Sequence, residues 1–283
     1  MSYDTGRSWR GGWGAGQRRV AFPRFSPAVK WLIVGNVAVF LVQVYFEYSR
    51  GVSLASYLGV VPGAVVERLH VWQIFTYMFL HSTAGNHIFH IILNMLFLYW
   101  FGTELDRLLG RWRFLMLYVA GGVAGGIAYA GTQYLTKATN PAIGASAAVM
   151  AVLVVYACHF PNRTVYLFYY VPMAVKWFVV AAIGMDLAYS VTAYADGVAH
   201  TAHLGGALYG FLHWRLGPRL ARYFEQVGDR HRERDARARA TDERRLDDLL
   251  GKITREGFDS LSRRERDFLT EQSRRRRERG YRS

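Results

Sequence analysis

Long apolar blocks follow one another through the middle of this chain and limit its fold more than any other feature. A helix needs about 20 apolar residues to cross the hydrocarbon core of a bilayer. The blocks are residues 31–47, 86–102, 113–135, 146–161, 175–194 and 200–215. The sequence therefore predicts an all-α membrane protein with six transmembrane helices. The fourth and sixth blocks are short for a full span and begin with polar residues.

Basic residues gather beside alternate ends of these blocks. They are Arg107, Arg111 and Arg113 after the second block, Arg163 after the fourth, and Arg215, Arg219 and Arg222 after the sixth. With six spans these groups share one side with the basic N-terminal segment. Positive residues beside spans mark the cytoplasmic side, so we expect an integral multi-pass membrane protein with both termini cytoplasmic. The Arg-rich, Lys-poor composition is compatible with a bacterial inner (plasma) membrane.

Composition divides the chain into four segments. Residues 1–29 are basic, lack the apolar region of a signal peptide, and are predicted to be a disordered cytoplasmic segment. Residues 30–216 form the membrane domain. Residues 217–245 carry mixed charge, as a linker or a solvated helix does. Residues 246–283 repeat apolar residues at helical spacing and end in arginines, which predicts a small cytoplasmic helical module with a basic end.

The connection between the first two blocks, residues 48–85, is too apolar and aromatic for a solvated linker. Long loops with structure of their own are usually functional. We expect this long outer loop to fold onto the membrane surface and the helix bundle.

The net charge of +14 comes mainly from the N-terminal segment and from the tail after Leu216. No nucleic-acid-binding module accompanies it, so we expect these flanks to meet anionic lipid and expect no nucleic-acid partner. The single cysteine, Cys158, cannot form an internal disulfide. The nine histidines show no zinc-site spacing such as H-E-x-x-H, and no metal or cofactor is predicted.

Polar side chains inside these blocks are costly at bilayer depth and usually mark function. His90 and Asn94 lie four residues apart in the second block and therefore share one helix face. They are either two donors aimed at one oxygen or a hydrogen-bonded pair that holds helices together.

Ser146 follows a backbone break at Pro141 and Gly144 and precedes a helix rich in Ala and Val. At a helix N-terminus, unpaired N–H groups and the positive dipole end can stabilise an oxyanion. The alternative is that Ser146 is only an N-cap.

His203 in the sixth block is followed by Gly206 and Gly210, a spacing that lets two helices approach closely. Ala147 and Ala151 line the helix after Ser146. If these small-residue faces pack together, Ser146 and His203 come near hydrogen-bonding range.

Together and in this order, these motifs resemble the rhomboid family of intramembrane serine proteases. The matching elements are His90-x-x-x-Asn94, Gly144-x-Ser146 and Ala202-His203-x-x-Gly206-x-x-x-Gly210. The resemblance covers residues 30–215 and implies a six-helix rhomboid bundle. Residues 246–269 also resemble a short helical module at the cytoplasmic C-terminus of some bacterial rhomboids.

The resemblance implies a catalytic dyad without the third carboxylate of soluble serine proteases. Ser146 would be the nucleophile and His203 its general base. The Ser146 N–H with the side chains of His90 and Asn94 would hold the oxyanion. The implied substrates are transmembrane segments of other membrane proteins, cut within the lipid bilayer. Asp186, a carboxylate in the fifth block, is interpreted as structural.

Three positions depart from the family pattern: Ala147 replaces Gly, Met150 replaces an aromatic residue, and Gln73 replaces Arg. None removes a catalytic group. His81 is expected near a hydrated mouth of the site. A silent rhomboid-like adaptor that binds transmembrane helices is the alternative function. A transporter would need repeat symmetry or a polar path across the membrane, and neither is visible.

Overall fold

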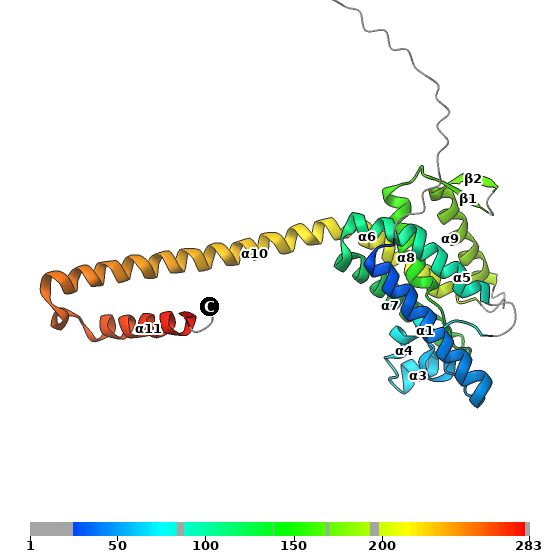
Figure 1. Cartoon of the computed structure of the whole chain (residues 1–283), viewed down its shortest axis with the longest axis horizontal. Helices are drawn as coiled ribbons and strands as arrows, with labels where there is room; N and C mark the ends of the chain where they lie inside the picture. The colour runs from blue at the N-terminus through cyan, green and yellow to red at the C-terminus, as the bar shows by residue number, and fades with distance from the viewer. Residues whose placement is uncertain (1–24, 84–87, 138, 168–169, 193–197, 281–283) are drawn as a thin grey trace, which may run out of the picture. The chain divides into compact units, whose positions relative to one another are not determined.

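The structure is a computed structural model and describes residues 25–83, 88–137, 139–167, 170–192 and 198–280. Helices make up most of these residues (Figure 1). The main helices are α1 (Pro27–Arg50), α5 (Ile88–Phe97), α6 (Thr103–Leu109), α7 (Arg111–Leu135), α8 (Ser146–His159), α9 (Val175–Thr192), α10 (His200–Glu256) and α11 (Arg263–Gly280). The disorder predicted for residues 1–29 falls largely outside the described residues.

Four stretches of the described chain are helical, long and apolar enough to cross a membrane: α1, Ile88–Leu109, α7 and α9. The second consists of α5 and α6 joined by a π-helical turn, η3 (Leu98–Gly102). Large apolar side chains on α1 and α9 face outward, as lipid contact requires. They include Trp31, Leu41 and Tyr45 on α1 and Trp177, Val180 and Val191 on α9. The all-α membrane bundle is confirmed, whereas the count of six spans stays a prediction.

Helix α8 lies at the centre of this bundle. Its 14 residues rise only about 21 Å, less than the hydrocarbon thickness of about 30 Å. All of Ala147–Ala157 is nevertheless buried in protein, so this short helix does not meet lipid along its length. Glycines let α7 approach it: a Cβ on Gly121 would lie 2.4 Å from the Cβ of Ala151, and one on Gly125 equally close to that of Ala147. Small residues therefore set how closely α7 and α8 approach each other.

The long loop folds onto the bundle, as its composition indicates. Its short helices are α2 (Ala55–Leu58), α3 (Pro62–Glu67), α4 (Gln73–Thr76) and η1 (Tyr77–Phe79). Both α3 and α4 pack against α7. The hydroxyl of Tyr77 donates a 2.7 Å hydrogen bond to the carbonyl of Gly122, and Val60 pairs with Ala142 just before α8. The loop thus supports the segment that leads into Ser146.

A small antiparallel hairpin was not predicted. Strands β1 (Thr164–Leu167) and β2 (Val171–Ala174) pair between α8 and α9 in the register Thr164 to Ala174. Their sequence continues the apolar pattern of the helices on either side, and strands this short carry too few residues for alternation to stand out.

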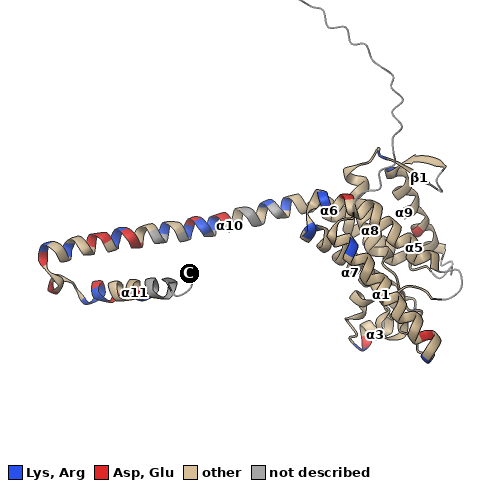
Figure 2. Cartoon of the chain, in the orientation of Figure 1, with Lys and Arg blue, Asp and Glu red and all other residues tan. Residues whose placement is uncertain are grey.

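The chain separates into two compact units, Met1–Arg215 and Leu216–Ser283. In the second unit the charged segment 217–245 is helical, which was one of the two interpretations of its sequence. Figure 2 shows basic and acidic residues interspersed along this part of α10, whereas the helices of the first unit are mostly uncharged. Helix α10 ends at Glu256. The next residue, Gly257, has a left-handed φ of +85°, and η4 (Phe258–Ser260) turns the chain into α11.

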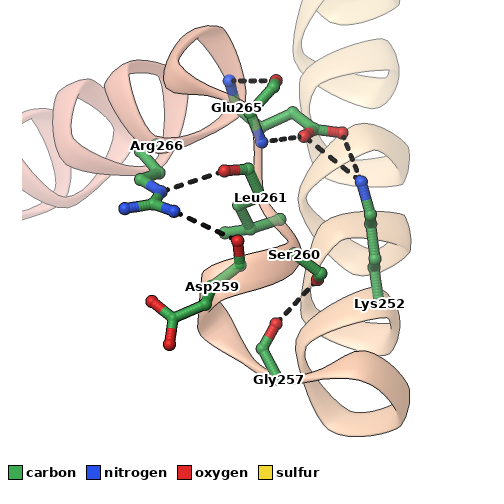
Figure 3. A network of polar contacts seen from close by, with 8 residues as sticks. Lys252, Gly257, Asp259, Ser260, Leu261, Glu265 and Arg266 are labelled. Atoms are coloured by element: carbon green, nitrogen blue, oxygen red, sulfur yellow. Dashed lines mark hydrogen bonds and ion pairs between the residues drawn. The ribbon is translucent and has the colours of Figure 1, made fainter.

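Polar contacts hold this turn (Figure 3). Lys252 Nζ lies 3.3 Å from both carboxylate oxygens of Glu265, and the Ser262 N–H donates to the same carboxylate at 2.7 Å. The Ser262 N–H lowers the pKa of Glu265. Ser262 and Glu265 form a capping box that starts α11. Among the side chains that the structure describes in this unit, Leu249 and Leu261 are buried.

Candidate active site

Ser146 is the first residue of α8, and Ala145 occupies the N-cap position without a side-chain cap. The interpretation of Ser146 as a simple N-cap is therefore wrong. Its backbone N–H belongs to the first turn, whose amides have no partner within the helix. Gly144 reaches this turn with a φ of +128°, a conformation that suits glycine. The break predicted from Gly144 thus presents the Ser146 hydroxyl and amide at a helix N-terminus.

Helix α10 brings His203 to Ser146. The ring Nε2 of His203 lies 2.6 Å from Ser146 Oγ. This distance is within the range over which a base can accept a hydroxyl proton. The two residues are 57 positions apart in sequence, so helix packing alone joins them.

The two glycines of the motif account for that packing. A Cβ on Gly206 would lie 2.1 Å from the carbonyl oxygen of Ala147, and a Cβ on Gly210 would lie 2.6 Å from that of Ala151. Neither position tolerates a side chain at this helix separation. The small-residue faces of α8 and α10 meet as the sequence indicates, and Ser146 and His203 come together as a result.

His90 and Asn94 lie on α5 beside this turn. A Cβ on Gly144 would be 2.7 Å from His90 Cε1, 3.0 Å from its Nε2, and 3.6 Å from Ser146 Oγ. The absent side chain of Gly144 therefore makes room for the His90 ring next to the serine. Asn94 is buried, and its amide nitrogen donates to the backbone carbonyl of His90 at 2.9 Å. An amide group has two N–H donors, so this bond leaves the second for another acceptor.

The structure also brings Asp186 to the site, although its sequence indicated only a structural carboxylate. Its Oδ1 lies 3.0 Å from His203 Nδ1 and 2.7 Å from His200 Nδ1. His200 is buried, and its ring packs 4.9 Å from that of Tyr189, centroid to centroid. The one signal available in the sequence was a lone carboxylate in an apolar span. His200 and His203 follow it after 14 and 17 residues and belong to a different helix, α10, so no helical spacing linked them to Asp186.

His81 does not lie at an open mouth. Its side chain is fully buried, with its ring 5.4 Å from that of His90, centroid to centroid. Burial lowers the pKa of His81 to about 3, and the nearby His90 adds to the effect. Gln43 on α1 fixes the His81 backbone through hydrogen bonds to its N–H and carbonyl.

The three residues that depart from the family pattern, Gln73, Met150 and Ala147, are all buried in the structure. Gln73 is buried, accepts from the Val61 N–H at 3.1 Å, and donates to the Tyr57 carbonyl at 3.2 Å, so it ties the outer loop together without an ion pair. Met150 and Ala147 are both buried in α8.

The fold and this site define a helical membrane protein with a hydrogen-bonded serine and histidine inside its bundle. Comparison with known families identifies the family of this chain. Residues 68–218, more than half of the chain, match the Rhomboid domain, and the chain belongs to the rhomboid family. Residues 233–275 match DUF6576, a family of unknown function. This second match begins before residue 246, where the helical module was expected to start.

Three relatives illustrate the family membership. The chain is 28% identical over 197 residues to RHOMBOID-like protein 12, mitochondrial, of Arabidopsis thaliana, a match covering 65% of this chain and 56% of the relative. It is 31% identical over 142 residues to presenilin-associated rhomboid-like protein A, mitochondrial, of Danio rerio, covering 50% and 36%. It is 30% identical over 151 residues to the human presenilin-associated rhomboid-like protein, mitochondrial, covering 50% and 38%. The matches thus span about a third to somewhat over half of these relatives.

Proposed function

We propose that this rhomboid-family protein is an intramembrane serine endopeptidase. The observation that carries the proposal is the 2.6 Å contact between His203 Nε2 and Ser146 Oγ. A serine is a weak nucleophile until a neighbouring base takes its proton, and histidine can do so near neutral pH.

The reaction would proceed through an acyl-enzyme. As Ser146 Oγ attacks the carbonyl carbon, His203 Nε2 takes the hydroxyl proton and the carbonyl oxygen becomes an oxyanion. When the oxyanion collapses, the C–N bond breaks and His203 gives its proton to the departing amine. A water molecule then attacks the ester with His203 again as base, which releases the carboxyl product and restores Ser146.

We assign the oxyanion to the Ser146 N–H and to the side chains of His90 and Asn94. His90 lies beside Gly144 and Asn94 one turn further along α5. Removing one such donor typically raises the barrier by about 2.7–4 kcal/mol. Substitution of His90 or Asn94 should therefore weaken cleavage strongly, but less than loss of Ser146.

The substrates would be transmembrane segments of other membrane proteins. A helix encloses its amides in hydrogen bonds, so the segment must unwind before a peptide bond reaches Ser146. Small or helix-breaking residues near the cut should favour cleavage for that reason.

We further propose that both termini lie on the cytoplasmic side, since arginines gather beside alternate span ends. A bacterial inner membrane is the proposed location. The relatives above carry the word mitochondrial in their names, which makes a mitochondrial membrane the competing location.

Cleavage of a single-span substrate in liposomes tests the function, with wild type beside Ser146→Ala and His203→Ala. We expect wild type to cut and each variant to lose at least about 10³-fold in rate. A fluorophosphonate probe should label Ser146 in wild type only. If wild type neither cuts nor labels, the protein is instead a silent adaptor that binds transmembrane helices.

A further inference from the structure

We infer that Asp186 and His200 act as a positioning pair, which holds His203 in the ring orientation and tautomer that Ser146 requires. This inference rests on the proposed function and extends its serine–histidine pair by one carboxylate and one further histidine. The four residues come from three helices, α8, α9 and α10.

The hydrogen bonds determine the tautomer. A carboxylate has no hydrogen to donate, so both imidazole nitrogens that contact Asp186 Oδ1 must carry one. His203 therefore has its hydrogen on Nδ1 and a lone pair on Nε2. That lone pair faces Ser146 Oγ at 2.6 Å, the arrangement a general base needs. The opposite tautomer would present an N–H to the serine and could not take its proton.

His200 anchors the carboxylate. Its contact with Asp186 Oδ1 is 2.7 Å, shorter than the 3.0 Å contact of His203. The side chains of Asp186 and His200 are only 9% and 10% exposed. A buried carboxylate is stable only when its oxygens are hydrogen-bonded. His200, held between Asp186 and Tyr189, supplies one such bond and fixes the carboxylate for His203.

A bound cation is the competing explanation, because ligand atoms of Asp186, His200 and His203 all lie within 4.8 Å of one another. Zinc with bonds of about 2.0–2.1 Å in a tetrahedral site would hold its ligands roughly 3.3 Å apart. The 2.7 and 3.0 Å separations are hydrogen-bond lengths instead. The geometry thus favours direct bonds, and stoichiometric zinc in purified protein would overturn the inference.

Nuclear magnetic resonance on the full chain, labelled with ¹⁵N-histidine in lipid nanodiscs, reads the tautomer directly. The His203 signals are assigned by difference from His203→Gln. We expect the hydrogen on Nδ1 in wild type and in Ser146→Ala, and a shift toward the Nε2–H form in Asp186→Asn. A wild-type ring with its hydrogen on Nε2, or a tautomer unchanged by Asp186→Asn, would overturn the inference.

Kinetics supply the second measurement. In soluble serine proteases the corresponding Asp→Asn change lowers kcat by about 10⁴-fold. We expect Asp186→Asn to lower kcat by roughly 10²- to 10⁴-fold with KM nearly unchanged. Ser190→Ala, also on α9, is the matched control and should keep wild-type kcat. A kcat for Asp186→Asn within about threefold of wild type contradicts the inference.

His200 offers a test that does not depend on Asp186 variants folding. In His200→Asn the side-chain amide places an N–H near the position of Nδ1, whereas His200→Phe keeps a ring but has no donor. We expect His200→Asn to stay close to wild type and His200→Phe to lose about 10- to 100-fold in kcat. Equal kcat values for His200→Asn and His200→Phe would contradict the proposed role of His200 in positioning Asp186. Wild type that keeps the Nδ1–H tautomer but neither cuts nor labels would reject the protease function alone.

Discussion

Gly144 combines two requirements at one residue. Its backbone has a φ of +128°, and its absent Cβ leaves room for the His90 ring at 2.7 Å. We predict that Gly144→Ala destabilises the fold by about 1–3 kcal/mol through backbone strain. It should also slow fluorophosphonate labelling of Ser146 at least about tenfold, because the serine turn moves. Thermal unfolding in detergent and the labelling rate measure the two effects.

Gly184→Ala on α9 is the control, since a Cβ there would meet nothing within 4 Å. It should label at the wild-type rate. Wild-type labelling by Gly144→Ala would mean that neither the strain nor the contact with His90 matters to the serine.

His81 makes stability depend on pH. Its folded pKa is about 3, against about 6.5 for an exposed histidine, so the unfolded chain binds a proton that the folded chain excludes. Stability from this residue is complete above pH 6.5 and falls as the pH drops toward 3. Between pH 7 and pH 5 the loss should be roughly 2 kcal/mol. Thermal midpoints of wild type should therefore fall over this range more than those of His81→Leu. Equal slopes would argue against a buried neutral His81.

The sequence predicts Ser146, His203, His90 and Asn94 as site candidates because each belongs to a motif of fixed local spacing. It could not predict the contact of Asp186 with His203. That contact joins α9 and α10, and the spacing of residues along the chain does not specify which faces of two separate helices meet. The missing information was tertiary rather than chemical, since an intramembrane carboxylate is itself a functional signal.

At the scale of elements, close approach between α8 and α10 determines the site. We predict that Gly206→Ala separates these helices, because its Cβ would lie 2.1 Å from the Ala147 carbonyl oxygen. Labelling of Ser146 should fall by about 100-fold, as expected when a reacting pair is displaced by about 1 Å. Labelling kinetics measure the effect, with Gly131→Ala on α7 as control because nothing lies within 4 Å of its Cβ. Equal rates for the two variants would mean that α8 and α10 adjust without moving His203.

The apolar pattern predicts which segments are helices better than it predicts where each helix begins and ends. The pattern marks α1, α7 and α9 because each has lipid-facing apolar residues along its length. The same pattern predicts α8 as a span, although this helix is buried in protein. A helix surrounded by protein and a helix surrounded by lipid both need apolar side chains, so composition does not distinguish them. The hairpin β1–β2 was not predicted from the sequence. A hairpin is recognised mainly by the register in which its strands pair, and strands of four residues are too short for the sequence to indicate that register.

At the scale of the whole molecule, all candidate site residues lie in the unit Met1–Arg215. The second unit has buried leucines of its own, Leu249 and Leu261, and an ion pair between Lys252 and Glu265. The DUF6576 match, residues 233–275, lies entirely within this unit. We therefore predict that residues 217–245 and 246–283 contribute no group to peptide cleavage.

A chain ending at Arg222 tests this separation. We predict that it inserts in the membrane and labels with fluorophosphonate within about threefold of the full chain, because the residues that position Ser146 and His203 here, Gly144, Asp186, His200 and Gly206, all lie in the unit Met1–Arg215. The matched variant is the full chain with Leu249→Ala, which opens a cavity in the second unit at a cost of about 2–5 kcal/mol and should leave labelling unchanged. If truncation abolishes labelling while Leu249→Ala does not, the helical continuation of α10 itself stabilises the site. If both abolish it, the second unit controls the site and the proposed separation is wrong.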